Sequence, residues 1–280
     1  MKELLKVIQF YKLRYESDKL ALDYFFSLFN NDYYIKSTRM IKTDEFNFIF
    51  FPKKKTTYQV CPLCFENIYL NPNLKIMPIL LNNRYYFIQP SIKQYVKNHL
   101  VIIDFTHKKM AIDNTIIISF YQFLKLFPSL VICSNCELEG IGGSILNHQH
   151  FQAGCIDSQL FKRDAELMDN EIYEVDWYLE TYLIKNVDIN IVNEKYLYLL
   201  EKCQNEATSF NPVMFIRDDV IYLYLIKRCK EEINIHKEYT SFKEGVGVFE
   251  VLGNFILNEQ QTPVNELIEN AKNILTYKRK

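Results

Sequence analysis

Apolar residues near the start of the chain recur at the spacing of an α-helix. Within residues 3–30 they fall at Leu4, Leu5, Ile8, Leu13, Leu20, Leu22 and Phe25. Residues three and four apart share one face of a helix. The pattern therefore predicts one or two amphipathic helices in this stretch.

From about residue 58 the pattern changes to short apolar runs that are typical of strands. We expect strands at residues 75–81, 85–89, 99–105 and 130–133, with Asn82 and Asn83 forming the turn between the first two. Residues 114–126 are predicted to form a helix that stops near Pro128. Helical spacing returns at residues 169–184 and 194–203.

The last third of the chain predicts three strands and a helix. The strands are expected at residues 212–216, 220–226 and 247–252, the first two joined by a turn at Asp218 and Asp219. Thr262 can cap the final helix and Pro263 fits its first turn. Meandering strands with peripheral helices predict an α+β fold with a largely antiparallel sheet. We expect three segments: an N-terminal helical segment (1–57), a first strand-containing half (58–160) and a second half (161–280).

Composition narrows the class of protein. The chain has 280 residues, 49% of them hydrophobic, and 33 basic against 34 acidic side chains. A nucleic-acid-binding protein usually has a basic excess, and the short Lys53–Lys55 run is better explained as a solvated loop. The start of the chain does not read as a signal peptide, and the apolar stretch 110–132 is interrupted by Asp113, Lys125 and Pro128. We therefore expect neither nucleic acid nor a membrane as a partner.

The cysteines indicate a compartment and a kind of site. Seven cysteines without an export signal predict a reduced, cytoplasmic setting, in which paired cysteines are metal ligands before they are disulfides. Cys61 and Cys64 can bind one tetrahedral metal ion, with His107 and His148 as candidates for the remaining positions. A redox role and a four-thiolate site with Cys133 and Cys136 remain open alternatives. We expect the other three to be small buried hydrophobic residues: Cys155, Cys203 and Cys229.

The strongest chemical signal follows a cluster of glycines. Four of the seven glycines lie within residues 140–154, and the other three lie within residues 245–253. His148, His150 and Gln152 fall two residues apart, so on a strand they would share one face. Imidazole is a competent nucleophile near neutral pH, and backbone amides at residues 142–144 could hold phosphate oxygens. The segment predicts a phosphate-handling site.

This segment carries a family resemblance. Residues 134–152 resemble the active-site segment of galactose-1-phosphate uridylyltransferases of the second bacterial class, within the histidine-triad superfamily. Residues 33–36, 61–67, 76–107 and 242–253 look like counterparts of further segments of that family in the same order.

The resemblance implies a fold, a reaction and a set of site residues. It implies a histidine-triad-like half-barrel sheet in a homodimer, and ping-pong transfer of a uridylyl group between a UDP-sugar and a sugar 1-phosphate. His150 would be the nucleophile and Gln152 would bind the phosphate; zinc would be held by Cys61, Cys64, His107 and His148. Substrate contacts are implied for Asn135, Gly142, Gly143, Ser144, Lys243, Gly247 and Glu250.

Two other functions remain open at this point. One is a phosphorylase or hydrolase of the same superfamily, which would cleave a nucleoside diphosphate-sugar or a dinucleotide. The other is an inactive, zinc-stabilised binding protein. Outside the site, His99 and Trp177 are expected to pack in the core, and His236 is expected to lie in a surface loop.

Overall fold

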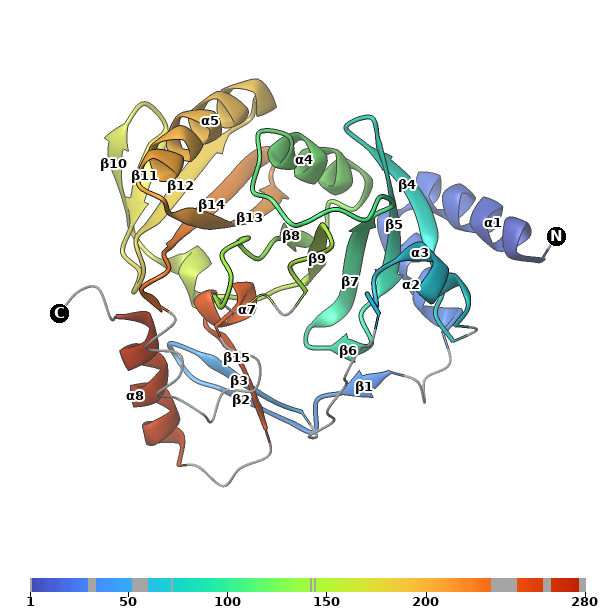
Figure 1. The fold of residues 1–280 in the computed structure, drawn as a ribbon, viewed down its shortest axis with the longest axis horizontal. Helices are drawn as coiled ribbons and strands as arrows, with labels where there is room; N and C mark the ends of the chain where they lie inside the picture. Colours follow the sequence, from blue (N-terminus) through green and yellow to red (C-terminus); the bar gives the residue numbers. More distant parts are fainter. Residues whose placement is uncertain are drawn as a thin grey trace.

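A ten-stranded antiparallel sheet forms the centre of the fold (Figure 1). The computed structural model describes residues 2–29, 34–51, 60–71, 73–141, 143, 145–232, 246–258 and 263–276. The predictions made for Lys53–Lys55, Gly142, Ser144, His236, Lys243 and Thr262 lie outside these residues.

The sheet runs in the order β10-β11-β12-β14-β13-β8-β9-β7-β5-β4, and each neighbouring pair is antiparallel. Its strands in chain order are β4 (Met77–Leu81), β5 (Arg84–Pro90), β7 (Lys97–Asp104), β8 (Val131–Cys133), β9 (His150–Cys155), β10 (Ala165–Asp169), β11 (Ile172–Val175), β12 (Thr181–Asn186), β13 (Ser209–Arg217) and β14 (Val220–Arg228). The predicted α+β class with a largely antiparallel sheet is confirmed.

Helices cover one face of this sheet. The buried core on that face combines side chains of α1 (Lys2–Glu16), α2 (Asp18–Ser27), α4 (Ile116–Leu126) and α5 (Ile189–Asn205) with inward-pointing strand residues such as Phe151. Their amphipathic patterns bury apolar stripes against the sheet, as predicted for residues 3–30, 114–126 and 194–203. We call this face of the sheet the helix face.

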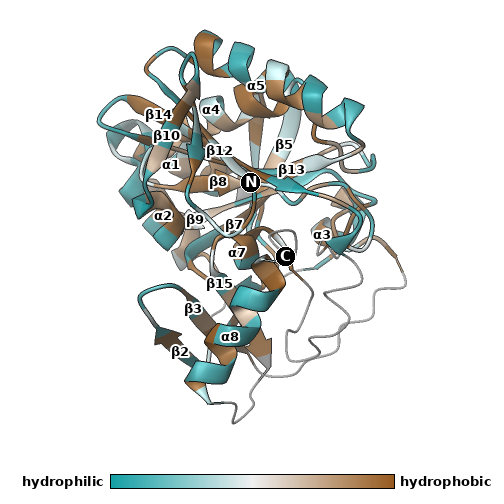
Figure 2. Cartoon of the chain, turned by 90° about the vertical axis from the view of Figure 1, so that its left-hand side faces the viewer, coloured by the Kyte–Doolittle hydropathy of each residue, from teal (hydrophilic) through white to brown (hydrophobic). Residues whose placement is uncertain are grey.

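The opposite face, which we call the site face, is covered by smaller elements. A second buried core joins it to a three-stranded sheet of β2 (Arg39–Lys42), β3 (Asn47–Phe51) and β15 (Asn254–Asn258), and to α7 (Val248–Val251) and α8 (Val264–Leu275). The short helix α3 (Phe65–Tyr69) packs over β5 and β7. Two-residue strands β1 (Ile35–Lys36) and β6 (Lys93–Gln94) pair in parallel, and a 3-10 turn covers Gln159–Lys162. Alternating hydrophilic and hydrophobic colour along α5 and α8 shows their amphipathic character (Figure 2).

Turns predicted from asparagine and aspartate pairs are confirmed. Asn82 and Asn83 have φ of 46° and 59°, and Asp218 and Asp219 have φ of 50° and 61°. Short polar side chains tolerate this left-handed backbone better than most residues. Both pairs join antiparallel strands in tight hairpins, which fixes the register of the strands on either side.

Two predicted elements were wrong. Residues 169–184 form strands β10 to β12 rather than a helix, because Asn170 and Glu171 make a left-handed turn and the flanking residues pair as strands. Residues 247–252 form α7 rather than a strand. Glu250 accepts a hydrogen bond from the backbone N–H of Gly247 at 2.9 Å, which caps this helix, and Gly253 with φ of 82° ends it.

Candidate functional site

Strand β9 places His150 and Gln152 together on the site face. Phe151 and Ala153 alternate with them and point into the core on the helix face. The segment that leads into β9 is held by Gln149, whose side-chain oxygen accepts from the N–H of Ala111 at 2.7 Å. Gln149 also bonds through its backbone to Lys108 and Asp104. These bonds fix the chain direction just before His150.

His150 is held in a single tautomer by a hydrogen bond to the backbone. Its side chain is 9% exposed, and Nδ1 lies 2.8 Å from the carbonyl oxygen of His148. A carbonyl only accepts hydrogen bonds, so Nδ1 carries the proton and Nε2 keeps its lone pair. Burial lowers the pKa of His150 below its usual range, which keeps the ring neutral at pH 7. The arrangement leaves one reactive nitrogen.

Gln152 is oriented by His99, a residue that the sequence suggested only as core packing. His99 is buried; its Nδ1 lies 2.8 Å from the carbonyl oxygen of Lys93, and its Nε2 lies 3.0 Å from the side-chain oxygen Oε1 of Gln152. Burial lowers the pKa of His99 to about 4, so the ring is neutral at pH 7 and offers a lone pair at Nε2. The contact is then attractive when the Gln152 amide turns its NH2 group toward His99.

Acid should destabilise the wild-type chain more than a His99→Asn variant. An unfolded histidine binds a proton below about pH 6.5, whereas folded His99 stays neutral until about pH 4. Its contribution to stability is complete above pH 6.5 and is lost as the pH falls, by about 2 kcal/mol at pH 5. Urea unfolding at pH 7 and pH 5 measures this, and an equal pH dependence in both proteins would contradict it.

Asn135 connects the glycine-rich turn to α7. Its side-chain oxygen accepts a hydrogen bond from the backbone N–H of Val248 at 2.7 Å. Gly143 lies beside it, since a Cβ built on Gly143 would fall 3.6 Å from the Cβ of Asn135. The structure thus brings Asn135, Gly143 and the first turn of α7 together. Gly247 and Glu250 belong to the same α7 turn through their capping bond.

A buried ion pair that sequence reasoning missed supports this turn. Arg228 is fully buried and contacts the carboxylate of Glu232 at 2.6 Å. Its guanidinium also donates to the side chain of Asn211 and to the carbonyl of Val246. Asn211 in turn donates to the carbonyl of Ser134 at 3.0 Å. Arg228 and Glu232 are four residues apart, but Asn211, Val246 and Ser134 are distant from Arg228 in the sequence, so only the fold reveals the whole network.

Replacing Arg228 by methionine should destabilise the chain by about 3–5 kcal/mol, because the buried Glu232 carboxylate loses this guanidinium. A double variant that also carries Glu232→Leu should recover much of that loss, since no charge is then left buried at the pair. Urea unfolding compares the two. Equal destabilisation of the single and double variants would show that the charge imbalance is not the cause.

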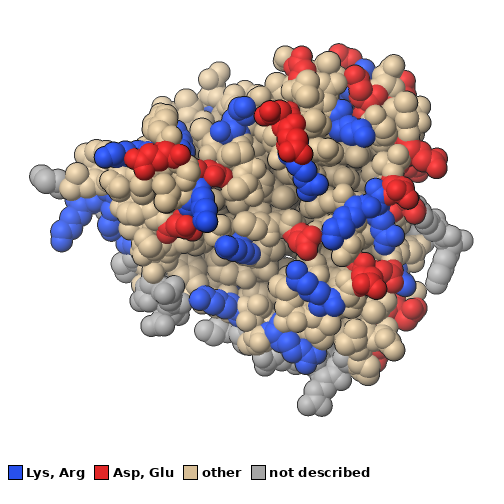
Figure 3. Space-filling view, turned by 180° about the vertical axis from the view of Figure 1, so that it is seen from behind, with Lys and Arg blue, Asp and Glu red and all other residues tan. Residues whose placement is uncertain are grey.

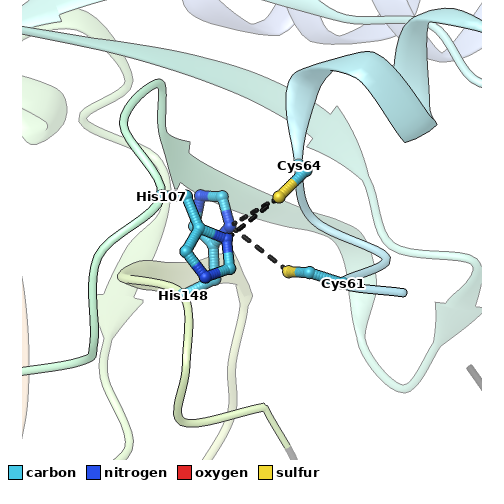
Figure 4. Close-up of side chains that lie close together, drawn as sticks. All are labelled: Cys61, Cys64, His107 and His148. Carbon is cyan, nitrogen blue, oxygen red and sulfur yellow. Dashed lines mark hydrogen bonds between the residues drawn. The ribbon is translucent and has the colours of Figure 1, made fainter. Parts of the chain in front are cut away.

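The four predicted metal ligands meet at one point (Figure 4). Their ligand atoms, two thiol sulfurs and two imidazole nitrogens, all lie within 4.8 Å of one another. Cys61 Sγ is 3.4 Å from His148 Nδ1, and Cys64 Sγ is 3.0 Å from His107 Nδ1. In a tetrahedral zinc site such atoms lie about 3.3–3.8 Å apart. The cluster could therefore bind a metal.

Neighbouring groups orient the four side chains of this cluster. His148 Nε2 donates to the carbonyl of Asp104 at 2.8 Å, which leaves Nδ1 free to face the thiols. Asn67 donates to the carbonyl of Cys61 at 2.7 Å and stabilises the turn between the cysteines. Burial and the adjacent Cys61 raise the pKa of Cys64 to about 11. A cation is the group that would reverse this shift and ionise the thiols.

The second cysteine pair, Cys133 and Cys136, lies outside the cluster of Cys61, Cys64, His107 and His148. Cys133 and Cys136 are both buried, and burial raises the pKa of each thiol. Among the residues that the structure describes, the Cys61 cluster is the one group that could hold a metal, so the four-thiolate alternative is not supported. Cys203 and Cys229 are buried as predicted, whereas Cys155 is exposed at the end of β9, so that prediction was wrong.

Charge on the outer surface is mixed. Lys and Arg side chains alternate with Asp and Glu on the face seen in Figure 3. A cavity of about 460 Å³ is lined largely by charged residues, among them Glu45 and Arg163, and does not include His150.

None of the helices in the described part of the chain has the length and apolar character that a membrane-spanning helix needs.

Solved structures define the class of fold. The chain superimposes on yeast Ap4A phosphorylase Apa2 in complex with AMP with a TM-score of 0.60 at 13% identity, covering 90% of this chain and 93% of that one. The same enzyme without the AMP ligand gives a TM-score of 0.59 at 10% identity. This chain thus has the fold of that phosphorylase.

Sequence relatives match parts of the chain. No family model matches, but stretches of the chain are similar to galactose-1-phosphate uridylyltransferases, in agreement with the resemblance. Identity is 36% over 109 residues to the Butyrivibrio fibrisolvens protein, 31% over 134 residues to that of Bacillus subtilis (strain 168) and 30% over 178 residues to that of Clostridium perfringens (strain SM101 / Type A). These matches cover 36%, 45% and 52% of this chain but span only 28%, 25% and 36% of the relatives' own lengths.

Proposed function

We propose that this chain is a nucleotidyltransferase that moves a uridylyl group from a UDP-sugar to a sugar 1-phosphate through a covalent intermediate on His150. The observation that carries the proposal is the hydrogen bond from His150 Nδ1 to the His148 carbonyl, which leaves Nε2 as a buried lone pair on the site face. The names of the sequence relatives supply the substrate class.

The proposed first step is an attack by His150 Nε2 on the α-phosphorus of the UDP-sugar. An N–P bond forms, the bond from this phosphorus to the bridging oxygen breaks, and the sugar 1-phosphate leaves with that oxygen. The ring becomes positively charged, and its Nδ1–H bond to the His148 carbonyl stabilises that charge. In the second step a different sugar 1-phosphate attacks the same phosphorus and releases His150.

Other residues hold the nucleotide in this proposal. Gln152 donates an N–H of its side-chain amide to a phosphate oxygen in this proposal. Asn135 and Gly143 line the turn that we assign to the phosphate. The resemblance implies the same role for Gly142 and Ser144, which lie outside the described residues. We assign Gly247 and Glu250 to the sugar side, where their capping bond shapes the start of α7. The resemblance implies the same role for Lys243, which lies outside the described residues.

Zinc is the metal that we assign to the Cys61, Cys64, His107 and His148 cluster. Two thiolates and two imidazoles at these separations match its tetrahedral preference. With all four positions taken by protein, the ion would hold the chain and leave no position for substrate. His148 then links the metal cluster to the nucleophile through its own carbonyl. We place the protein in the cytoplasm and expect a homodimer.

A phosphorylase is the second candidate. It is favoured by the fold shared with yeast Ap4A phosphorylase across 90% of this chain. In that reaction, inorganic phosphate rather than a sugar 1-phosphate would accept the nucleotidyl group from His150. The two candidates share the first half-reaction and differ in the second.

An acceptor assay distinguishes these functions. The chain is incubated with UDP-glucose and either galactose 1-phosphate, inorganic phosphate or buffer alone, and the uridine products are separated by chromatography. The proposal predicts UDP-galactose as the main product. UDP formed from inorganic phosphate would favour the phosphorylase, and no turnover with any acceptor would favour the inactive binding protein.

A further inference from the structure

The cavity that contains Arg163 is built from segments that the proposed reaction does not use. Its volume of about 460 Å³ falls within the range of about 300–1,000 Å³ that is typical of small-molecule sites. Its lining comes from the turn between β2 and β3, from the 3-10 turn and Arg163 that follows it, and from the loop between β11 and β12. Neither His150 nor a residue of the metal cluster lines it. The cavity is therefore a candidate for a second binding site.

The lining of this cavity is polar throughout. Its eight residues supply three carboxylates, two cations, one carboxamide and two aromatic rings that each carry a polar atom, and none of them is aliphatic. Sites for apolar ligands are lined mainly by apolar side chains. The lining thus favours a ligand that is rich in hydrogen-bonding groups.

One of the three carboxylates is already paired within the fold. Glu45 contacts Lys272 at 2.7 Å and accepts a hydrogen bond from the hydroxyl of Tyr178. The ring of Tyr178 packs against Phe46, with 5.3 Å between the ring centroids. These contacts fix one wall of the cavity and neutralise the charge of Glu45.

The other charged side chains of the lining balance one another. Lys162 and Arg163 carry two positive charges, and Asp44 and Asp176 carry two negative charges. An anion would meet the two carboxylates and a cation would meet the two basic groups, each at a cost in electrostatic energy. A hydroxyl group carries no charge and both donates and accepts hydrogen bonds. A neutral ligand with several hydroxyl groups therefore suits groups of both signs.

Arg163 is held at the wall while its donors are left for a ligand. Its guanidinium lies 5.6 Å from the ring centroid of Trp177, a cation–π contact that fixes its position. Its side chain forms no ion pair or hydrogen bond with another described residue. Trp177 is only 2% exposed, and its Nε1 donates to the carbonyl of Val251 at 2.9 Å. A rigid wall thus presents a guanidinium with five N–H donors.

Helix α7 separates this cavity from the candidate active site. Its last residue, Val251, accepts the hydrogen bond from Trp177 in the cavity wall. Its first residue, Val248, donates to Asn135 beside the glycine-rich turn. The two sites therefore lie at opposite ends of α7 and are distinct.

We propose that this cavity binds a neutral, polyhydroxylated ligand, namely an uncharged sugar. Hydroxyl groups of the sugar accept from Arg163 and Gln159 and donate to the carboxylates of Asp44 and Asp176. The inference concerns a site without His150, so it stands or falls independently of the proposed function.

The fluorescence of Trp177 measures binding at this cavity, because it is the only tryptophan in the chain. The protein is titrated with D-glucose, D-galactose and lactose, and separately with glucose 6-phosphate, glucosamine and free glutamine. We expect saturable binding of at least one neutral sugar, and binding of the charged and zwitterionic ligands that is several-fold weaker or absent. Tighter binding of any of these three ligands, or no saturable binding of a neutral sugar, would overturn the inference.

Two variants locate the bound sugar. Arg163→Ala and Asp176→Ala should each weaken its binding roughly 10-fold, since each removes a charged hydrogen-bonding partner. Ligand-observed NMR titration repeats the measurement, because Arg163→Ala also changes the surroundings of the indole. The matched control is Arg217→Ala, because the Arg217 guanidinium also lies over a ring, 5.3 Å from the centroid of Phe215, but outside this cavity. The control should bind as wild type does, and wild-type affinity in Arg163→Ala and Asp176→Ala would show that the sugar binds elsewhere.

Discussion

A His150→Asn variant should lose nucleotidyl transfer by at least about 10⁴-fold while keeping the fold. Removing a covalent nucleophile commonly costs this much or more. Asparagine can still offer a side-chain N–H to the His148 carbonyl, the bond that His150 Nδ1 makes. It has no basic nitrogen to attack phosphorus. Initial rates of UDP-galactose formation from UDP-glucose and galactose 1-phosphate measure the loss.

The control for this variant is Gln152→Glu, which keeps the nucleophile and places a carboxylate beside the phosphate. We expect it to lower the rate by repulsion of the phosphate and to leave covalent labelling detectable at high UDP-glucose. Circular dichroism and the thermal midpoint confirm that both variants are folded. A His150→Asn protein with more than a few per cent of wild-type activity would exclude His150 as the nucleophile.

Loss of a metal ligand should have the second-largest effect. Cys64→Ser replaces the thiol 3.0 Å from His107 Nδ1, and the remaining three ligands no longer complete a protein-only tetrahedral site. We expect zinc content to fall from about one ion per chain to a small fraction, and the thermal midpoint to fall by several degrees or more. Because His148 belongs to the same cluster and its carbonyl holds His150, activity should fall with the metal.

Cys155→Ser is the matched control, since Cys155 is exposed and lies outside the metal cluster. It should retain both zinc and stability. Metal is measured by inductively coupled plasma mass spectrometry on protein purified without chelator, and stability by calorimetry. Equal zinc content in Cys64→Ser and Cys155→Ser would contradict the assignment of the cluster.

Local sequence patterns predicted most of the fold. Helical spacing located α1, α2, α4 and α5, and paired Asn or Asp residues located two hairpin turns. These patterns depend on residues close together in the sequence, so they can be recognised without the tertiary structure. The two elements that were predicted wrongly depend on other interactions: strand pairing forms β10 to β12, and a side-chain cap stabilises α7. The spacing of apolar residues over 169–184 also fits a helix, and the Glu250 cap on α7 depends on geometry rather than hydropathy.

The residues of the candidate site also differ in how far the sequence predicts them. His148, His150 and Gln152 lie two residues apart in the sequence, and the spacing of Cys61 and Cys64 predicted a metal site with His107 as a candidate ligand, so the sequence was sufficient to predict these residues. His99 and Arg228 were not assigned to the site from sequence, because their contacts arise from strand register and burial. His99 on β7 contacts Gln152 on β9, and Arg228 contacts Asn211, which bonds the carbonyl of Ser134 next to Asn135.

The covalent intermediate is tested most directly by intact-protein mass spectrometry after brief incubation with UDP-glucose and no acceptor. We predict a mass gain of one uridylyl group on wild type that disappears when galactose 1-phosphate is added, and no gain on His150→Asn. An unmodified wild-type protein that still forms UDP-galactose, or a uridylyl group retained on His150→Asn, would contradict transfer through His150.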